Sequence, residues 1–205
     1  MFVTLEGIDR AGKSTQAKLL HRELGPEALL LREPGGTPAG ERMRELLKDP
    51  ALELDARAEL LLFCAARAEL VERVIRPAVD SGRQVVCDRF IDSTVAYQGI
   101  GRGLGVELVE SLNESAVAGC EPDLTILLRV DPELAASRGQ QRLAEGLADG
   151  SDRFEAEGPE FQRRVALAYD EIAERHPDRS VFVDASAPLA DVHEEVISAV
   201  RSVNA

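Results

Sequence analysis

The sequence predicts a three-layer α/β fold in which a five-stranded parallel sheet is flanked by helices. Five short apolar runs alternate with helical segments along the 205 residues, and this alternation favours parallel strands joined by right-handed crossovers. Glycine-rich or charged segments follow several of the runs, and ligands of such folds bind at the carboxyl ends of the strands. The length suits one well-buried domain and is too short for two ordinary ones.

The first predicted strand, residues 2–6, leads into a segment that fits the pattern G-x-x-x-x-G-K-[ST]. Glycines in this pattern let successive backbone N–H groups point at phosphate oxygens at the start of a helix. We therefore predict a P-loop NTPase fold with a nucleotide phosphate site formed by Gly7, Ile8, Asp9, Arg10, Ala11, Gly12, Lys13, Ser14 and Thr15. Lys13 would hold the β- and γ-phosphates, and the Ser14 hydroxyl would bind Mg²⁺.

The next elements follow from helix and turn signals. A helix over about 13–24 ends before a Gly-Pro pair, and a second strand at 28–32 precedes the Pro- and Gly-rich loop 33–38. A helix is expected at 39–47. The longest helix is predicted over 55–79, and its middle, 60–66, is apolar on all sides and is expected to be buried.

Three further strands are predicted at 83–87, 124–128 and 180–183. The polar segment 139–151 contains three glycines and interrupts a helical pattern that resumes near Pro159. We interpret it as a mobile flap within a lid of about 138–155.

Composition narrows the class of partner. A net charge of −13 argues against a surface that neutralises a nucleic-acid backbone, and no apolar run approaches the length that spans a bilayer. Nothing at the N-terminus resembles an export signal, so a cytoplasmic location is expected. The three cysteines lie in apolar or helical sequence and are expected to be reduced, buried thiols.

A phosphate-binding loop alone leaves several functions open. A GTPase reading is weak because no lysine follows an asparagine, as the guanine-reading N-K-x-D segment would require. A hydrolytic ATPase would often end an apolar strand in Asp-Glu, whereas Asp88 here is followed by Arg89. That pair suits an acceptor phosphate held close to a metal ion, although a structural salt bridge at the strand end is the alternative.

Several longer motifs resemble those of the thymidylate kinases, which transfer phosphate from ATP to dTMP. They occur in the family's order over nearly the whole chain: the segment from Gly7 to Thr15, Arg32-Glu33-Pro34-Gly35-Gly36-Thr37-Pro38, Phe63-Cys64-Ala65-Ala66-Arg67, Asp88-Arg89-Phe90, Ser93-Thr94-Val95-Ala96-Tyr97-Gln98-Gly99, Pro122-Asp123-Leu124 and Asp152-Arg153-Phe154. The Glu-Pro-Gly-Gly-Thr loop and the Tyr-Gln-Gly segment are the more specific ones. Arg129 departs from the acidic residue that many relatives carry there.

The resemblance implies a role for each acceptor-site residue within about 33–98. Phe63 packs on thymine and Arg67, four residues later on the same helix face, donates to its 4-oxo group. Arg89 holds the acceptor phosphate, and Asp88 orients Mg²⁺ or its waters. The remaining implied contacts are Asp9 and Tyr97 at the sugar, Thr94 and Gln98 near the base, and Pro34 beside the acceptor. The residues alone favour Phe63 as a plain core residue, whereas the charge of Arg67 in an apolar helix needs a partner.

Phosphoryl transfer requires positive charge rather than a strong base, because the attacking phosphate monoester is already largely dianionic. Candidate catalytic residues are Lys13, Asp88, Arg89, Arg10 in the phosphate-binding loop, and Arg138, Arg142 and Arg153 around the flap. Members of the family usually take the key arginine from either the loop or the flap, and this sequence offers both. The flap arginines could instead pair with Glu145, Asp149 and Asp152.

The sequence therefore predicts an ATP-dependent dTMP kinase that needs Mg²⁺. Alternatives are a kinase for another nucleoside monophosphate and a regulatory ATPase switch that needs no acceptor. The resemblance also implies a homodimer, to which the long helix 55–79 could contribute.

Overall fold

The computed structural model describes residues 1–146, 153–154 and 157–203, apart from the side chain of Arg142. Its sheet has the order β2-β3-β1-β4-β5, and every neighbouring pair is parallel. The strands are β1 (Phe2–Glu6), β2 (Leu29–Arg32), β3 (Val85–Asp88), β4 (Leu124–Arg129) and β5 (Ser180–Asp184). The predicted five-stranded parallel sheet is confirmed, with strand ends within two residues of those expected.

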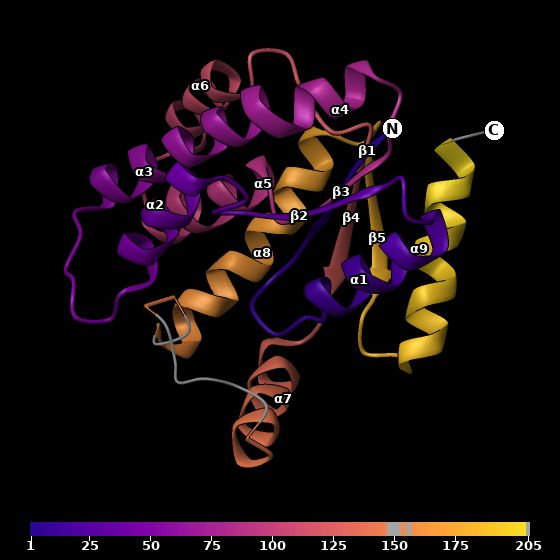
Figure 1. Ribbon diagram of the computed structural model, residues 1–205. Helices are drawn as coiled ribbons and strands as arrows, with labels where there is room; N and C mark the ends of the chain where they lie inside the picture. The colour runs from indigo at the N-terminus through magenta and orange to yellow at the C-terminus, as the bar shows by residue number, and fades with distance from the viewer. Residues whose placement is uncertain (147–152, 155–156, 204–205) are drawn as a thin grey trace.

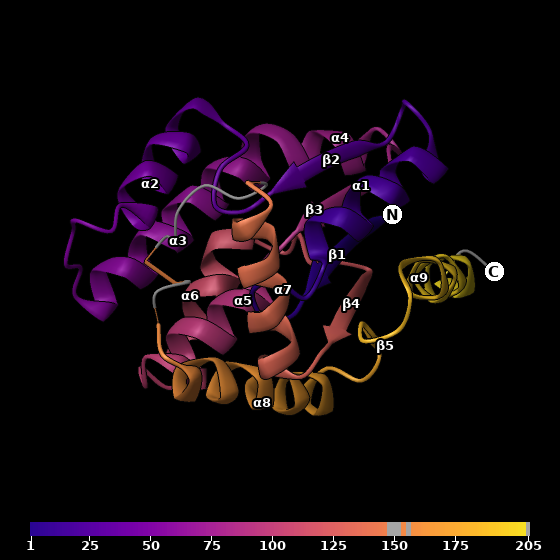
Figure 2. The same ribbon diagram turned by 90° about the horizontal axis from the view of Figure 1, so that it is seen from below.

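Helices cover both faces of the sheet (Figures 1 and 2). One layer consists of α1 (Lys13–Leu24) and α9 (Leu189–Val203). The other contains α3 (Ala56–Leu70), α4 (Arg76–Asp80), α5 (Ile91–Thr94), α6 (Val106–Val117) and α8 (Pro159–Arg175), together with the π-helical segments η1 (Val71–Ile75) and η2 (Val95–Gly101). Helix α2 (Pro38–Lys48) packs against α3, and α7 (Pro132–Ala144) extends beyond the carboxyl ends of the strands (Figure 1).

The central strands lie in the core. Every residue of β1 is buried, as are Val85, Val86 and Cys87 of β3, which is expected where helices cover both faces of a parallel sheet. The five strands run in one direction, so the segments that follow β1, β2, β3 and β4 meet at one edge. The phosphate-binding loop, residues 33–38 and Asp88-Arg89 are thereby brought together.

The predicted helix over 55–79 is not continuous. It divides into α3, the π-helical turn η1 and α4. Pro77 has no amide hydrogen to donate to the preceding turn, and the Arg76 N–H bonds to the Val71 carbonyl five residues back. The wider turn accommodates the proline while the chain keeps its direction.

The expectation that 60–66 is buried on all sides is wrong in part. Leu60, Cys64 and Ala66 are buried, but Leu61 is 55% exposed and Ala65 is also exposed. Helix α3 lies in the outer layer, so its own domain covers only one face. An apolar stripe is left at the surface.

The predicted flap begins too early. Gly139 lies inside α7, which continues to Ala144, and Gly146 takes a positive φ of 68° after the helix. Most of the rest of the predicted lid, including Asp149, Gly150 and Asp152, lies outside the described residues. The helix resumes at Pro159 as expected.

Two further expectations concern the cysteines and the absence of a membrane-spanning segment. The three cysteines are buried and free. Across the part of the chain that the structure describes, no helix combines the length and apolar character needed to cross a bilayer.

Candidate active site

The phosphate-binding loop joins β1 to α1 with backbone conformations that glycine favours. Gly7 has φ 134° and Gly12, the residue before α1, has φ 102°. A Cβ on Gly7 would lie 2.6 Å from the Leu128 carbonyl oxygen, so β4 and the loop can approach this closely only without a side chain there. The loop ends at the N-terminus of α1, where unpaired N–H groups and the helix dipole favour an anion.

Lys13 is held at the floor of this loop. Its side chain is 5% exposed, and Nζ donates to the Ile8 carbonyl over 2.6 Å. Burial and the positive charge of Arg89 lower the pKa of Lys13 to about 8. Next to it the Ser14 hydroxyl donates to the Asp88 carboxylate in a very short contact. The structure thus places together the two residues predicted to bind Mg²⁺.

Arg89 follows β3 in the left-handed region, with φ 73°, a backbone conformation that costs free energy for a non-glycine residue. Its guanidinium donates to Asp9 Oδ1 over 2.6 Å, and to the Tyr97 hydroxyl over 3.1 Å. Tyr97 in turn donates to Asp9 Oδ2 over 2.9 Å. We refer to Arg89, Asp9 and Tyr97 as the Arg89 cluster. Burial raises the pKa of Asp9, but the charges of Arg89 and Lys13 outweigh it and hold that pKa below its usual value.

Glu6 is a buried carboxyl group that is linked to Arg89 through Ser93. This carboxylate at the end of β1 is fully buried and accepts hydrogen bonds from the Phe90 N–H, the Ser93 hydroxyl and the Tyr169 hydroxyl. Burial, followed by the negative charge of Asp92, raises the pKa of Glu6 to about 7. Ser93 also accepts from Arg89 over 2.9 Å, so Glu6 and Arg89 share a partner.

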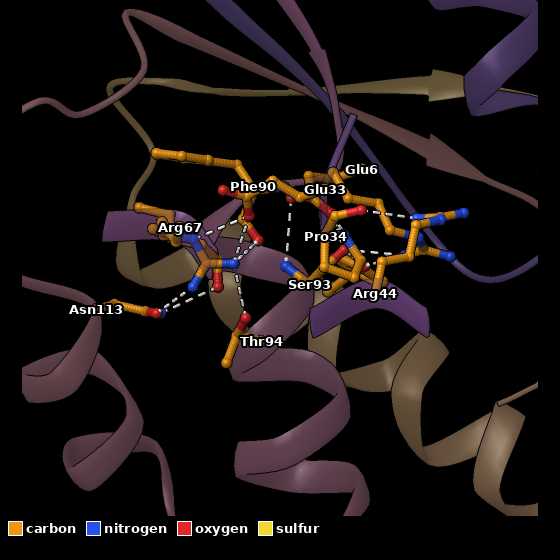
Figure 3. Close-up of polar contacts among 12 residues, drawn as sticks. Glu6, Glu33, Pro34, Arg44, Arg67, Phe90, Ser93, Thr94 and Asn113 are labelled. Atoms are coloured by element: carbon orange, nitrogen blue, oxygen red, sulfur yellow. Dashed lines mark hydrogen bonds and ion pairs between the residues drawn. The ribbon is translucent and has the colours of Figure 1, made fainter. Parts of the chain in front are cut away.

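Arg67 lies on the other side of the site, on α3, and is 1% exposed (Figure 3). It donates from Nε and Nη2 to Glu33 Oε2 over 2.9 and 2.6 Å, and from Nη1 to Asn113 over 2.6 Å. Nη2 also contacts the Phe90 carbonyl and the Thr94 hydroxyl. Arg67, Glu33, Asn113 and Thr94 form the Arg67 cluster. Burial alone would lower the pKa of Arg67, yet the Glu33 charge outweighs it and raises that pKa.

A cavity of about 250 Å³ lies between the two clusters. It is lined by phosphate-loop residues, by Pro34 and Arg67, by Arg89, Tyr97 and Gln98, and by two aromatic rings, Phe63 and Phe154. The centroids of Phe63 and Phe154 are 5.7 Å apart, and Tyr97 and Phe154 are 6.2 Å apart. The cavity therefore has an aromatic wall, an anion-binding floor that includes Lys13, and the buried cation Arg67 on its other side.

Comparisons with known proteins match this arrangement over nearly the whole chain. Residues 5–196 match the family described as thymidylate kinase. The chain belongs to the thymidylate kinase family. It is 45% identical to the thymidylate kinase of Chlorobaculum parvum, covering 99% of this chain and 96% of that protein, and 46% identical to that of Desulfovibrio desulfuricans, covering 98% and 95%. The crystal structure of thymidylate kinase from Ehrlichia chaffeensis superposes with a TM-score of 0.77 at 36% identity, covering 98% of each chain.

The arginines proposed from the thymidylate kinase resemblance occupy different places. Arg10 lines the cavity between the clusters. Arg138 donates to the Ala185 carbonyl over 2.9 Å and so joins α7 to the loop after β5. Arg153 donates to the Leu47 carbonyl over 3.1 Å and pairs closely with Glu59. The side chain of Arg142 lies outside the described residues. Of Arg10, Arg138 and Arg153, Arg10 is the one that lines the cavity with Lys13 and Asp88.

Glu59 is a buried charge next to the cavity that sequence reasoning missed. Its carboxylate is 1% exposed and accepts from Gln98 over 2.8 Å, from Arg102 over 3.2 Å and from Arg153. It fastens Arg153, beside Phe154, to α3. A charge in an apolar helix was the available signal, the same one that marked Arg67. Asn113 and Tyr169 carried no comparable signal, because their partners are distant in sequence.

Proposed function

We propose that this protein transfers the γ-phosphate of ATP to dTMP, giving dTDP and ADP for DNA precursor supply in the cytoplasm. The observation that carries the proposal is the shared cavity. The phosphate-loop residues Lys13 and Ser14 line the same space as Arg89 and the aromatic Phe63. A regulatory ATPase needs only the phosphate-loop residues, whereas the binding of a second nucleotide also requires a cation such as Arg89 and an aromatic ring such as Phe63.

The donor side suits a nucleotide polyphosphate with Mg²⁺. Backbone N–H groups at the start of α1 and the Lys13 ammonium provide positive charge for the β- and γ-phosphates. Ser14 and Asp88 provide a hydroxyl and a carboxylate that touch each other, and oxygen donors of this kind are the ligands that Mg²⁺ prefers. When bound, the ion would neutralise charge on the transferring phosphoryl group. Arg10 would add positive charge at the boundary between donor and acceptor.

The acceptor side suits a pyrimidine deoxynucleotide. Phe63 and Phe154 offer apolar faces for a base. The described contacts use one of the two hydrogens on Arg67 Nη1, which leaves the other for a carbonyl such as O4 of thymine; the amino group of cytosine would offer a donor instead. Tyr97 lies between the aromatic wall and Asp9, where its ring would crowd a ribose 2′-hydroxyl. Arg89 would exchange part of its bonding to Asp9 for the acceptor phosphate.

The proposal is tested by ADP production with ATP and Mg²⁺ against dTMP, dUMP, UMP, dCMP, dGMP and dAMP, with a no-acceptor control. Selective turnover of dTMP is expected. Turnover of a different monophosphate would retain the kinase chemistry and overturn the roles of Phe63 and Arg67. Hydrolysis that ignores every acceptor would favour the switch function instead.

We also infer that the protein is a homodimer that uses the exposed apolar stripe of α3. Leu61 and Ala65 lie on this stripe at the surface, and exposed apolar patches mark interaction surfaces. Light scattering should give twice the 22.2 kDa chain mass. The Leu61→Glu variant should give the monomer mass, while Leu167→Glu, on an exposed position of α8, should not alter assembly. A monomeric wild-type protein would overturn this inference and leave the proposed chemistry intact.

A further inference from the structure

Arg10 adopts an unusual backbone conformation in the phosphate-binding loop. Its φ is 65°, in the left-handed region that a non-glycine residue rarely occupies and that costs about 1–3 kcal/mol. The side chain leaves the loop towards α7 and lines two spaces at once: the cavity between the clusters and a second cavity of about 380 Å³ bordered by α7 and α8. Arg10 therefore stands where the loop, α7 and the acceptor cavity meet.

Gly139 of α7 meets Arg10 at this point. A Cβ on Gly139 would lie 2.3 Å from both Cδ and Nε of Arg10, and 2.6 Å from its Cζ. These distances are far below van der Waals contact, so the Arg10 side chain fills the space that any side chain at position 139 would need. Ala135, one turn earlier, is also small and 2% exposed. The surface of α7 is therefore recessed where it faces Arg10.

A glycine at this position contradicts the local preference of the helix. Gly139 lies in the interior of a helix that runs from Pro132 to Ala144, where glycine is the least favourable residue after proline. Its φ is not positive, so the backbone does not require glycine. Violations of a local rule are expected where function compensates for them, and the contact with Arg10 is the feature that a side chain would abolish.

We infer that Gly139 is a positioning residue that seats the Arg10 guanidinium beside the transferring phosphoryl group. The inference rests on the proposed function, because it gives Arg10 a role in phosphoryl transfer. The atoms that crowd position 139 belong to the outer part of a flexible side chain. Added bulk would therefore rotate Arg10 away while the loop backbone and α7 keep their places. The contact between Arg10 and Gly139 thus couples the phosphate-binding loop to α7.

The test is the Gly139→Ala variant. It should be more stable because alanine favours a helix, and it should be less active if Gly139 positions Arg10. Alanine is the better helix former, so the midpoint of thermal unfolding should rise by about 2–4 °C. Displacement of Arg10 should nevertheless lower kcat at least about tenfold, since small misplacements of a charged group weaken transition-state stabilisation strongly. The KM for dTMP should change less than about twofold. A variant that is more stable and fully active would overturn the inference.

Two controls separate this effect from others. In an Arg10→Ala background, Gly139→Ala should have no further effect on kcat; an equal fold-loss in both backgrounds would mean that position 139 acts on something other than Arg10. Gln141→Ala, on the exposed side of α7, should leave kcat unchanged. Arg10→Ala itself reports on the proposed function, because full activity in that variant would remove Arg10 from phosphoryl transfer whatever Gly139 does.

Discussion

Two arginines border the same cavity, and their surroundings differ. Arg67 is 1% exposed and bonds to a carboxylate, an amide, a hydroxyl and a backbone carbonyl from three different segments. The side chain of Arg89 is 18% exposed, and its carboxylate partner Asp9 is 20% exposed. Both arginines line the cavity, but the ion pair of Arg67 with Glu33 is buried whereas that of Arg89 with Asp9 is partly exposed.

From this difference we expect Arg67 to contribute more to the stability of the fold, and Arg89 to be the more available to an incoming anion. A buried charge whose partners are all protein groups is strongly destabilising to disrupt, because the remaining partner stays buried and unpaired. A partly exposed charge can be rehydrated or can change partners when an anion arrives. We therefore expect substitutions in the Arg67 cluster to act first on stability, and those in the Arg89 cluster to act first on turnover.

The largest effect is expected for Arg67→Met. The variant leaves Glu33 buried without its counterion and should lose about 3–5 kcal/mol of unfolding free energy in chemical denaturation. Adding Glu33→Gln should recover part of the loss, since no carboxylate then remains uncompensated. A loss below about 1 kcal/mol of unfolding free energy would show that the Arg67 cluster does not stabilise the fold in the way proposed.

Arg89→Ala should reverse this pattern. It removes the cation proposed to hold the acceptor phosphate, and kcat/KM for dTMP should fall by about 10²–10³, as for other preorganised charge contacts. Stability should change less than in Arg67→Met, because water can reach Asp9. Arg42→Ala, which breaks an exposed ion pair with Glu45, is the matched control and should stay within about twofold in the same assay. Normal turnover by the Arg89 variant would contradict the assignment.

Glu6 offers a pH test of the support behind Arg89. Its pKa is raised from 4.5 to about 7 in the folded protein. The stabilisation that comes from the protonated carboxyl is therefore complete below about pH 4.5 and is lost as the pH rises to about 7. The Glu6→Gln variant should gain stability over the wild type across this window, on the order of 3 kcal/mol. Denaturation at pH 4.5, 6 and 7.5 checks the slope; parallel curves would contradict it.

The smallest effect is expected for Tyr97→Phe. The hydroxyl links Arg89 to Asp9, and its loss should cost about 1.5 kcal/mol of stability, the scale of one hydrogen bond to a charged group. The ring remains, so the ratio of dUMP to UMP turnover, two acceptors that differ only at the 2′ position, should be preserved. Tyr97→Ala should lower that ratio if the ring excludes the 2′-hydroxyl. An unchanged ratio in the alanine variant would remove Tyr97 from sugar selection.

The sequence predicted the sheet, and the strand, loop and helix start around Lys13, because those features are local. The apolar runs, the glycines and the Lys13-Ser14 pair lie within short segments whose spacing alone specifies a strand, a loop and a helix start. The buried partners were harder to predict. The charge of Arg67 showed that a partner had to exist, but its partners lie 23 to 46 positions away. No local pattern specified which of them it would contact.

The same limit explains the helices that were misjudged. Residues 60–66 are apolar on every side, and the sequence could not show which side the domain leaves uncovered. The glycine at position 139 was assigned to the predicted flap because glycine is a frequent helix breaker, whereas it lies inside α7 against Arg10, about 130 positions earlier. A glycine can be required for several structural reasons, and the sequence alone does not show which of them applies.

Arg129, the departure from the family pattern, also has a consequence for solubility. Strand β5 is at one end of the sheet, and Val181 and Phe182 on it are 36% and 37% exposed. The Arg129 guanidinium lies 3.8 Å from the centre of the Phe182 ring and pairs with Asp170 of α8 over 2.5 Å. Exposed apolar edge strands recruit other chains, and a charge placed over them opposes that pairing. We therefore expect the charge of Arg129 to disfavour edge-to-edge pairing at β5.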